Sequence, residues 1–392
     1  MQQNAGSPEW PGVLTMRHSQ ADRQRIDRTP KTPMQSIEQA FDVPAHQETP
    51  AAWYGPDMAG RSDWIEHLAA AELDELAVAS AALAEPGVDL AALLAPDHPL
   101  PRLAPRLKSI AQDVLEGRGF VLLRGLPVER WGRMQAARAF LLLGAHLGSA
   151  RPQNAQGDLL GHVRDMGLRS ADPAVRIYQT SERQTFHTDS CDIVGLLCLH
   201  TARSGGQSAL VSSTTLFNEL RRRRPDLAAQ LFQPVATDRR GEVPPGEKPY
   251  FSIPVFNWWP HGASGQLSAI YQRQYIDSAM RFADAPRHTE ALTQALDLLD
   301  TLSNDPALHF LMDLQPGDIQ LVHNHTLLHD RTAFEDWPEP QHRRHLLRLW
   351  LAPPTARPLP GVYAQRYGST EPGARGGVCL PTARWNVPID AL

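Results

Sequence analysis

The sequence predicts a mainly β protein with flanking helices, in which many short strands form a sandwich or a barrel-like jelly roll. Short β-rich runs recur after residue 150 and are separated by Pro, Gly, Asn or Asp, as expected for strands joined by turns. Helical spacing of apolar residues is found mainly before residue 150. With 392 residues, 42% hydrophobic and 21% charged, the chain has the composition of a globular protein with a sizeable core.

The first 150 residues are expected to form a tail, several helices and one strand. Residues 1–36 are polar, contain Pro and Arg and lack any period, which predicts a disordered N-terminal tail. Helices are expected over 63–84, 100–118 and 133–148, where apolar residues have helical spacing and glycine ends the last two. Between them, "GFVLLRGLP" (119–127) predicts a short buried strand closed by Gly and Pro.

The rest of the chain is expected to be β-rich, with one helix over 289–305. No internal repeat or linker divides it, so residues 37–355 are predicted to form a single jelly-roll domain together with the N-terminal helices. Residues 356–392, rich in Pro, Gly and Arg, are predicted to be a C-terminal extension. The expected strands include "VRIYQT", "IVGLLCLHTA", "QSALVSS", "YFSIPVF", "QLSAIYQRQY", "DIQLVHN" and "HLLRLWLA".

Charge and composition argue against several classes of partner. The net charge of −5, from 38 basic and 43 acidic side chains, is unfavourable for a nucleic-acid binder, which needs a basic surface. The longest apolar runs are too short to cross a bilayer, and the N-terminus lacks a signal peptide's apolar core. Three cysteines without a CxxC pattern do not form a disulfide framework. We therefore expect a cytoplasmic protein that acts on a small molecule, and the sequence leaves the oligomeric state open.

Histidine is abundant, with 16 residues, and it is the commonest metal ligand. In "TFHTDSCDIVG", His187 and Asp189 are two residues apart, so a strand would point both toward one face. They would supply two ligands of a 2-His-1-carboxylate triad, the arrangement of non-haem iron(II) oxygenases. Candidates for the third ligand are His323, His325 and His329 in "GDIQLVHNHTLLHDRTAFEDW".

Two arginines near the end of the β-rich part are candidates for carboxylate binding. Arg344 and Arg348 are four residues apart in "HRRHLLRLWLA", which places them on one face of a strand. A guanidinium group matches a carboxylate with two parallel hydrogen bonds. Arg348 lies between two leucines, where an unpaired charge would be costly.

Taken in order, the HxD pair, the later histidine and the arginine resemble the TauD/TfdA family of iron(II)- and 2-oxoglutarate-dependent dioxygenases. The resemblance extends over about residues 110–355 and includes "FHTDSCDIVGLLCLH", "SGGQSALVSS" and "HDRTAFEDWPEPQHRRHLLRLWLA". It implies a double-stranded β-helix, the jelly roll of the clavaminate synthase-like type, with helices packed outside and iron at the mouth of the barrel.

The resemblance also implies roles for individual residues. His187, Asp189 and His329 correspond to the metal ligands and catalytic centre, since His329 follows Asn324, the Asn that ends the strand in the family motif; His325 is the alternative ligand. Arg344 corresponds to the arginine that binds the distal carboxylate of 2-oxoglutarate. For the cosubstrate, the resemblance adds Ser208, in "GGQS" where the family often has Thr, and Arg348, which in some relatives instead binds an acidic group of the primary substrate. Asn324 is a further candidate for the primary substrate, and so is Arg183, from its position a few residues before the metal motif.

The chemistry implied by the resemblance is oxidation of a small organic substrate with iron(II), 2-oxoglutarate and O2, releasing succinate and CO2. Halogenating relatives lack the carboxylate ligand, so Asp189 favours hydroxylation. Two alternatives stay open from the residues themselves. One is a metal-dependent hydrolase or isomerase that uses the same triad, although such an enzyme does not need the arginine pair. The other is a non-catalytic metal- or ligand-binding module.

Overall fold

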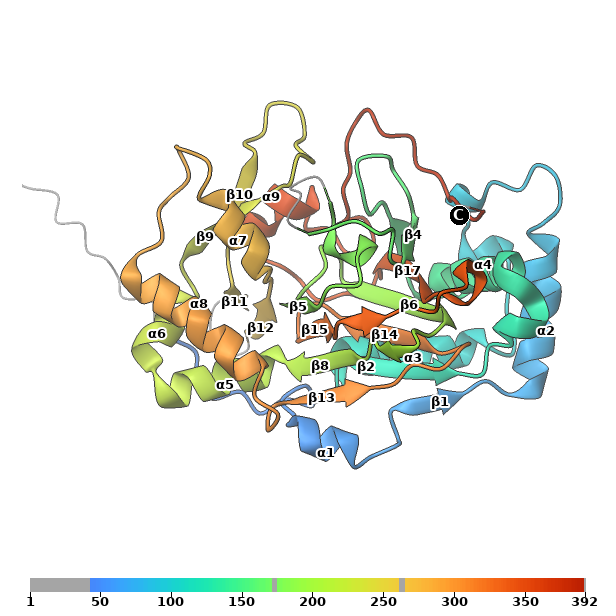
Figure 1. Ribbon diagram of the computed structural model, residues 1–392, viewed down its shortest axis with the longest axis horizontal. Helices are drawn as coiled ribbons and strands as arrows, with labels where there is room; N and C mark the ends of the chain where they lie inside the picture. The colour runs from blue at the N-terminus through green and yellow to red at the C-terminus, as the bar shows by residue number, and fades with distance from the viewer. Residues whose placement is uncertain (1–42, 171–174, 261–264, 391–392) are drawn as a thin grey trace, which may run out of the picture. The chain divides into compact units, whose positions relative to one another are not determined.

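The computed structural model describes residues 43–170, 175–260 and 265–390. The predicted tail, residues 1–36, lies outside the described residues. Within the described residues, no helix is both long and apolar enough to span a membrane. Two sheets of mostly antiparallel strands form the centre of the described chain, and helices cover the outer side of each (Figure 1).

The larger sheet has seven strands, and most of the strands that pair with each other in it are far apart in sequence. Its central strand pairs are antiparallel, and the short edge strand β1 runs parallel to β2. A further strand, β4 (Leu160–Val163), pairs with β17 beside β3. The order of the other strands is β1 (Ile65–His67), β2 (Phe120–Arg124), β14 (Ile319–His323), β6 (Ile193–His200), β17 (His345–Ala352) and β3 (Ser149–Arg151).

The smaller sheet has four antiparallel strands and carries both histidines of the predicted triad. Its order is β13 (His309–Met312), β8 (Ser208–Ser212), β15 (Leu327–Arg331) and β5 (Gln184–His187). In the β15–β5 pair, His329 lies directly opposite His187. Side chains directly opposite each other in a ladder are close neighbours, so strand pairing brings together two residues that are distant in sequence.

Alternating residues of the two sheets form an inner core and two outer cores. Phe120, Val194, Leu210, Leu327 and Trp350 belong to one buried cluster made by strands of both sheets. Their sequence neighbours on the same strands instead pack against helices, as the twofold period of a strand requires. Inward positions therefore face the space between the sheets.

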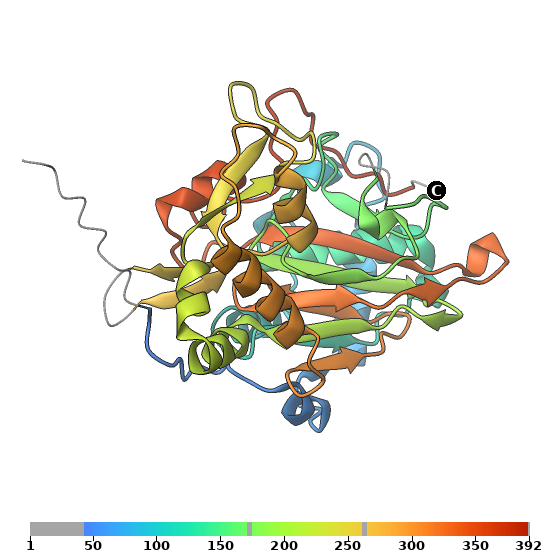
Figure 2. The ribbon, with the colours of Figure 1, turned by 60° about the vertical axis from the view of Figure 1, so that its left-hand side comes forward.

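Separate groups of helices cover the two sheets. The larger sheet packs against α2 (Ala70–Ala82), α3 (Ala104–Glu116) and α4 (Val128–Leu147). The smaller sheet packs against α5 (Ser213–Arg223), α6 (Pro225–Gln230) and α8 (Glu290–Ser303), which lie together in Figure 2. The predicted mainly β architecture with flanking helices is confirmed.

The prediction of a helix over 63–84 was wrong for the first residues of this range. Residues Ile65–His67 form β1, which pairs in parallel with β2, and the helix begins only at Ala70. Backbone pairing at the sheet edge outweighs helix propensity in this short stretch. The side chain of Glu72 then accepts a hydrogen bond from the backbone of Ala69 at 2.8 Å, which satisfies one free N–H at the helix start.

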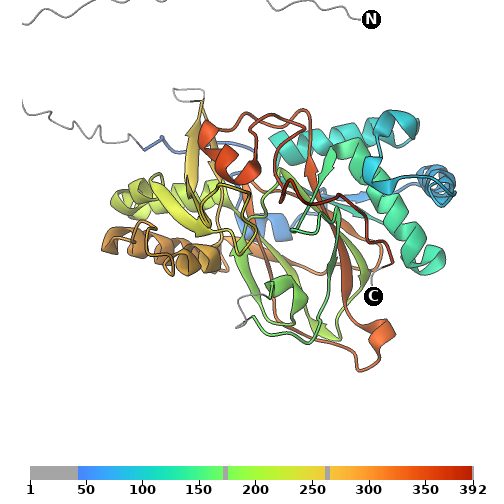
Figure 3. The ribbon, with the colours of Figure 1, turned by 90° about the horizontal axis from the view of Figure 1, so that it is seen from above.

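Smaller elements complete the fold around these sheets. In the C-terminal segment, α9 (Ala364–Tyr367) packs against β10 (Tyr250–Pro254), as Figures 1 and 3 show in red and yellow. The division between a domain ending at residue 355 and an extension stays a prediction. The other elements are α1 (Gly55–Ala59), β7 (Ser204–Gly205), β9 (Pro234–Asp238), β11 (Phe256–Trp259), β12 (Gln266–Ala269), α7 (Arg273–Ala279) and β16 (Phe334–Glu335).

Candidate active site

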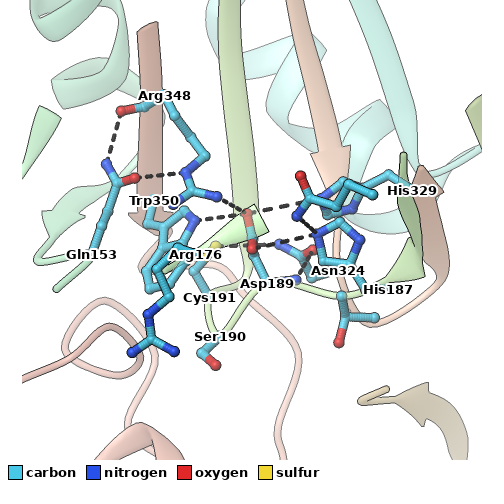
Figure 4. Close-up of polar contacts among 12 residues, drawn as sticks. Gln153, Arg176, His187, Asp189, Ser190, Cys191, Asn324, His329, Arg348 and Trp350 are labelled. Carbon is cyan, nitrogen blue, oxygen red and sulfur yellow. Dashed lines mark hydrogen bonds and ion pairs between the residues drawn. The ribbon is translucent and has the colours of Figure 1, made fainter. Parts of the chain in front are cut away.

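His187, Asp189 and His329 form a compact cluster where the end of β5 lies beside β15 (Figure 4). Their ligand atoms all lie within 4.8 Å of one another. Nε2 of His187 lies 3.9 Å from Oδ1 of Asp189, and Nε2 of His329 lies 3.9 Å from Oδ2. All three side chains are buried. Two imidazoles and one carboxylate at these separations fit a single iron(II) ion with open coordination positions.

Hydrogen bonding prepares His187 to bind a metal. Its Nδ1 lies 2.9 Å from the carbonyl oxygen of Thr185. A carbonyl can only accept, so Nδ1 carries the proton and Nε2 keeps its lone pair. The side-chain amide of Gln184 lies 2.8 Å from that Nε2 and can donate a hydrogen bond to its lone pair when that lone pair does not bind a metal. A protein carbonyl that fixes the tautomer of a histidine is a common feature of metal sites.

Burial keeps both histidines neutral, as ligation requires. It lowers the pKa of His329 to about 3, and the neighbouring His187 adds to the shift. Burial also lowers the pKa of His187 against the opposing effect of Asp189. For Asp189, burial alone would raise the pKa, but Arg348 and the two histidines outweigh it and hold the pKa below its ordinary value. At neutral pH the site therefore offers two neutral imidazoles and one carboxylate.

Three side chains hold Asp189 in position. The indole Nε1 of Trp350 donates to Oδ2 of Asp189 at 2.8 Å, and Nη1 of Arg348 lies 3.3 Å from the same oxygen. The backbone N–H of Asp189 donates to the side chain of Asn324 at 2.9 Å. Arg348 is itself fixed, because its Nε donates to Oε1 of Gln153 at 2.7 Å. These contacts, drawn in Figure 4, orient the carboxylate toward the histidines.

A cavity beside the cluster contains two buried arginines that lack a carboxylate partner. Arg344 and Arg331 line this cavity together with Ser208, His187 and His329. Among the described residues, neither guanidinium forms an ion pair with a carboxylate. Arg331 donates to the backbone carbonyls of Thr180 and Glu182, whereas Nη1 of Arg344 has no hydrogen-bond partner. Burial lowers the pKa of Arg344 to about 10 and that of Arg331 to about 9. An unpaired buried charge is costly, so this cavity fits a carboxylate ligand such as 2-oxoglutarate.

The turn before Ser208 gives Arg344 the space that it occupies. Gly206 has a φ of +72°, and a Cβ added there would lie 3.0 Å from Nε of Arg344. Glycine is the residue that adopts this backbone conformation without strain. Ser208 lines the same cavity, but its hydroxyl donates to Oε1 of Gln320 at 3.0 Å, so in this geometry its proton is directed to Gln320 and not to a carboxylate ligand.

A second cavity meets the cluster from the other side. It shares Tyr178, Gln184, His187, Asp189 and Arg348 with the first cavity. Its further wall consists of apolar, aromatic and charged side chains, including Ile253, Tyr271, Tyr275, Arg176, Glu242 and Arg366. His187 and Asp189 thus lie where the two cavities adjoin, whereas His329 lines only the first, and of the two cavities one is suited to a carboxylate and one is of mixed character.

Other predicted site residues lie elsewhere. Arg183 is 44% exposed in its side chain, pairs with Asp330 at 2.6 Å and lines neither cavity. His325, the alternative metal ligand, instead bonds to Asp192 at 2.9 Å, and His323 bonds to the hydroxyl of Thr326 at 3.0 Å. Asn324 contacts the backbone of Asp189 and not a cavity. It is a positioning residue in this structure.

Several site residues were missed from the sequence, and two of them carried a usable signal. Arg331 follows His329 by two residues on β15, and Trp350 follows Arg348 by two on β17, so the strand period alone places each on the inner face. Gln153, Arg176 and Arg366 reach the site from loops and a short helix, where no periodicity indicates direction.

Comparison with known proteins agrees with this geometry. A family model described as "Taurine catabolism dioxygenase TauD, TfdA family" matches residues 86–350. The chain belongs to the TauD/TfdA dioxygenase family. Enzymes of the TauD/TfdA family are 2-oxoglutarate-dependent non-haem iron dioxygenases, and so is this chain. The predicted enzyme class and its requirements for iron(II), 2-oxoglutarate and O2 are thus confirmed.

The chain is similar to several individual proteins with different names. The TauD/TfdA chain is 32% identical to FR-33289 synthase of Streptomyces rubellomurinus over 324 residues, which cover 81% of this chain and 94% of the relative. It is 32% identical to a uridine-5'-phosphate dioxygenase of Amycolatopsis over 45% of this chain and 63% of that protein. The non-haem iron oxygenase OrfP in complex with Fe and α-ketoglutaric acid shares the fold, with a TM-score of 0.54, 17% identity and coverage of 73% and 93%.

Proposed function

We propose that this dioxygenase hydroxylates a small organic substrate at an iron centre held by His187, Asp189 and His329. The observation that carries the proposal is the pair of cavities that adjoin at this cluster. One accommodates a dicarboxylate, and the other leaves room for a second molecule beside the same metal. When bound, iron(II) supplies the oxidative chemistry, in which 2-oxoglutarate becomes succinate and CO2 and one oxygen atom enters a C–H bond of the substrate.

The protein's own groups bind, orient and exclude water. Arg344 holds the distal carboxylate of 2-oxoglutarate through its fork of N–H donors, with Arg331 adding positive charge in the same cavity. Trp350 and Arg348 orient Asp189, and Thr185 fixes the tautomer of His187. Ser208 lines the cosubstrate cavity while its hydroxyl donates to Gln320. We further propose that the two facing sheets are the halves of a double-stranded β-helix of the clavaminate synthase-like type, with the triad at its mouth.

The relatives support a small-molecule substrate, since one is named for uridine 5'-phosphate. Arg348 is occupied by Asp189 and Gln153, so we assign it to positioning of the metal ligand. We also propose that the enzyme works in a reducing compartment such as the cytoplasm, because its three cysteines are free.

Oxygen-dependent formation of succinate tests the proposal. The full chain with iron(II), 2-oxoglutarate and O2 is expected to release succinate and CO2 slowly without a primary substrate and faster with one. Zinc(II) in place of iron(II) is the control and should give no succinate, because zinc has no redox chemistry. A chain that binds iron(II) but forms no succinate under any of these conditions would contradict the proposed function.

Replacing Arg344 tests the cosubstrate cavity. Arg344→Gln removes the charge-assisted hydrogen bonds to the distal carboxylate, so the KM for 2-oxoglutarate should rise by about 10- to 100-fold. Arg344→Lys keeps the charge without the fork and should fall between this variant and the wild type. The neighbouring Arg343 is exposed, and Arg343→Gln should leave the KM unchanged. An unchanged KM in Arg344→Gln would remove Arg344 from the proposed site.

A further inference from the structure

The second cavity has an excess of positive charge at the end formed by loops and by α9. Its charged groups are Arg176, Glu242, Arg366, Arg348 and Asp189. Asp189 and Arg348 pair with each other at 3.3 Å and belong to the metal site. This leaves two guanidiniums and one carboxylate, a net charge of +1 in a largely buried wall.

Both guanidiniums share the same counter-ion. Nη2 of Arg176 lies 2.8 Å from Oε1 of Glu242, and Nη2 of Arg366 lies 3.8 Å from Oε2. Within the described part of the chain, Glu242 is the one carboxylate within 4.0 Å of either arginine. The side chains of Arg366 and Glu242 are only 9% and 12% exposed, so solvent screens this group weakly.

Besides Glu242, the two arginines contact the backbone carbonyl of Arg240, which accepts from Nη2 of Arg176 at 3.2 Å, and two hydroxyls that have a proton to donate. Arg366 Nε donates to Oγ of Ser190 at 2.8 Å, and Arg176 Nη1 donates to the hydroxyl of Tyr275 at 3.1 Å. Each hydroxyl oxygen accepts from an arginine, so its own hydrogen is free to point into the cavity. Ser190 directly follows Asp189 in sequence, which connects this group to the metal site, and Figure 4 shows Arg176 and Ser190 on the same side of Asp189.

We propose that Arg176 and Arg366 bind an anionic oxyacid group of the primary substrate, namely a carboxylate, sulfonate, phosphonate or phosphate. This inference rests on the proposed function and adds a substrate class to it. The substrate anion takes the place between the two guanidiniums that Glu242 holds in the free enzyme, and the hydroxyls of Ser190 and Tyr275 donate to it. A cationic substrate group is disfavoured, because Glu242 already faces two positive charges.

The C-terminal segment is built to hold Arg366 in this position. Arg375 and Asp192 are fully buried and joined at 2.7 Å, and the backbone N–H of Gly377 donates to the carbonyl of Ser190 at 2.8 Å. These contacts attach the segment to the loop that carries Asp189. The matched family region ends at residue 350, so Arg366 is a specificity residue from outside that region.

Binding measurements without turnover test the inference. The full chain loaded with iron(II) and 2-oxoglutarate, in the absence of O2, is titrated by calorimetry with propylphosphonate, propane-1-sulfonate and butanoate, and with neutral butanamide and cationic propylammonium. The anionic probes should bind, and the neutral and cationic probes should not. The order among the three anions assigns the oxyacid. Failure of every anionic probe to bind the wild type would overturn the proposal.

Charge-changing variants give effects of opposite sign. Arg176→Gln and Arg366→Gln should each weaken binding of the tightest anionic probe by about tenfold or more, and Arg366→Lys should recover part of that loss. Glu242→Gln removes the competing carboxylate and should strengthen binding. Arg222→Gln, an exposed arginine on α5, is the matched control and should bind like the wild type.

Two results would overturn the inference. One is wild-type affinity in both arginine variants while circular dichroism shows that they are folded. The other is binding of propylammonium that Glu242→Gln abolishes. Succinate formation by the wild type separates this failure from failure of the proposed function. Lost anion recognition with intact succinate formation refutes only the inference, whereas anion binding without any succinate formation refutes the proposed function.

Discussion

Asp189→Ala is expected to abolish both iron(II) binding and succinate formation. Asp189 provides the one carboxylate of the cluster, and its two oxygens lie 3.9 Å from the two histidine nitrogens. Replacement of a residue that only supports a metal ligand typically costs about 10- to 100-fold in affinity, so loss of the ligand itself should cost at least about 100-fold. Equilibrium dialysis with iron(II) under anaerobic conditions and succinate release measure the two effects.

A graded variant distinguishes loss of the ligand from loss of its orientation. Trp350→Phe removes the indole donor to Oδ2 of Asp189 and keeps an aromatic ring between the sheets, so iron(II) affinity should fall by about tenfold. Asp226→Ala removes an exposed carboxylate on α6 and serves as the control. If Asp189→Ala binds one iron(II) per chain as tightly as the wild type, the cluster is not the metal site.

The metal cluster could be anticipated because part of it obeys a local rule. His187 and Asp189 are two residues apart at the end of a strand, and Arg344 and Arg348 have even spacing beside and within β17, so each pair shares a face. The third ligand depends on pairing of β15 with β5, a contact between segments far apart in sequence. Periodicity left three histidines open there, and the family resemblance selected His329.

The second cavity could not be anticipated in the same way. Arg176, Glu242 and Arg366 come from three separate segments, and none has a spacing that points to the others. Their meeting depends on how the C-terminal segment packs against β10 and the Asp189 loop. The stretch that forms β1 was misassigned for a related reason, because pairing at a sheet edge is decided by the partner strand and not by local propensity.

The buried ion pair between Arg375 and Asp192, which fixes the C-terminal segment, is expected to have a large effect on stability. Arg375 makes three hydrogen bonds to Asp192, and both side chains are fully buried. Burial alone would raise the pKa of Asp192, but hydrogen bonds from His325 and Arg375 outweigh it and hold the pKa below its ordinary value. The carboxylate is therefore ionised at neutral pH and needs its partner.

Arg375→Met should lower the free energy of unfolding by about 3–5 kcal/mol, because it leaves Asp192 buried without its cation. The double variant Asp192→Asn with Arg375→Met removes both charges and should recover part of this loss. Arg224→Met breaks an exposed pair, with side chains 48% and 60% accessible, and should change stability by less than about 1 kcal/mol. Urea unfolding followed by tryptophan fluorescence measures all three.

The pH dependence of stability provides an independent check on the same pair. A carboxyl whose pKa is lower in the folded protein stabilises the fold above the unfolded pKa, and this contribution is lost as the pH falls through the folded value. The wild type should therefore lose more stability than the double variant between neutral and acidic pH. Equal stability of Arg375→Met and Arg224→Met at neutral pH would mean that water reaches Asp192, and the C-terminal segment would then not be fixed by this pair. Arg366 would lose its anchor in that case, so the stability of one ion pair and the recognition of the substrate anion are linked through the same loop.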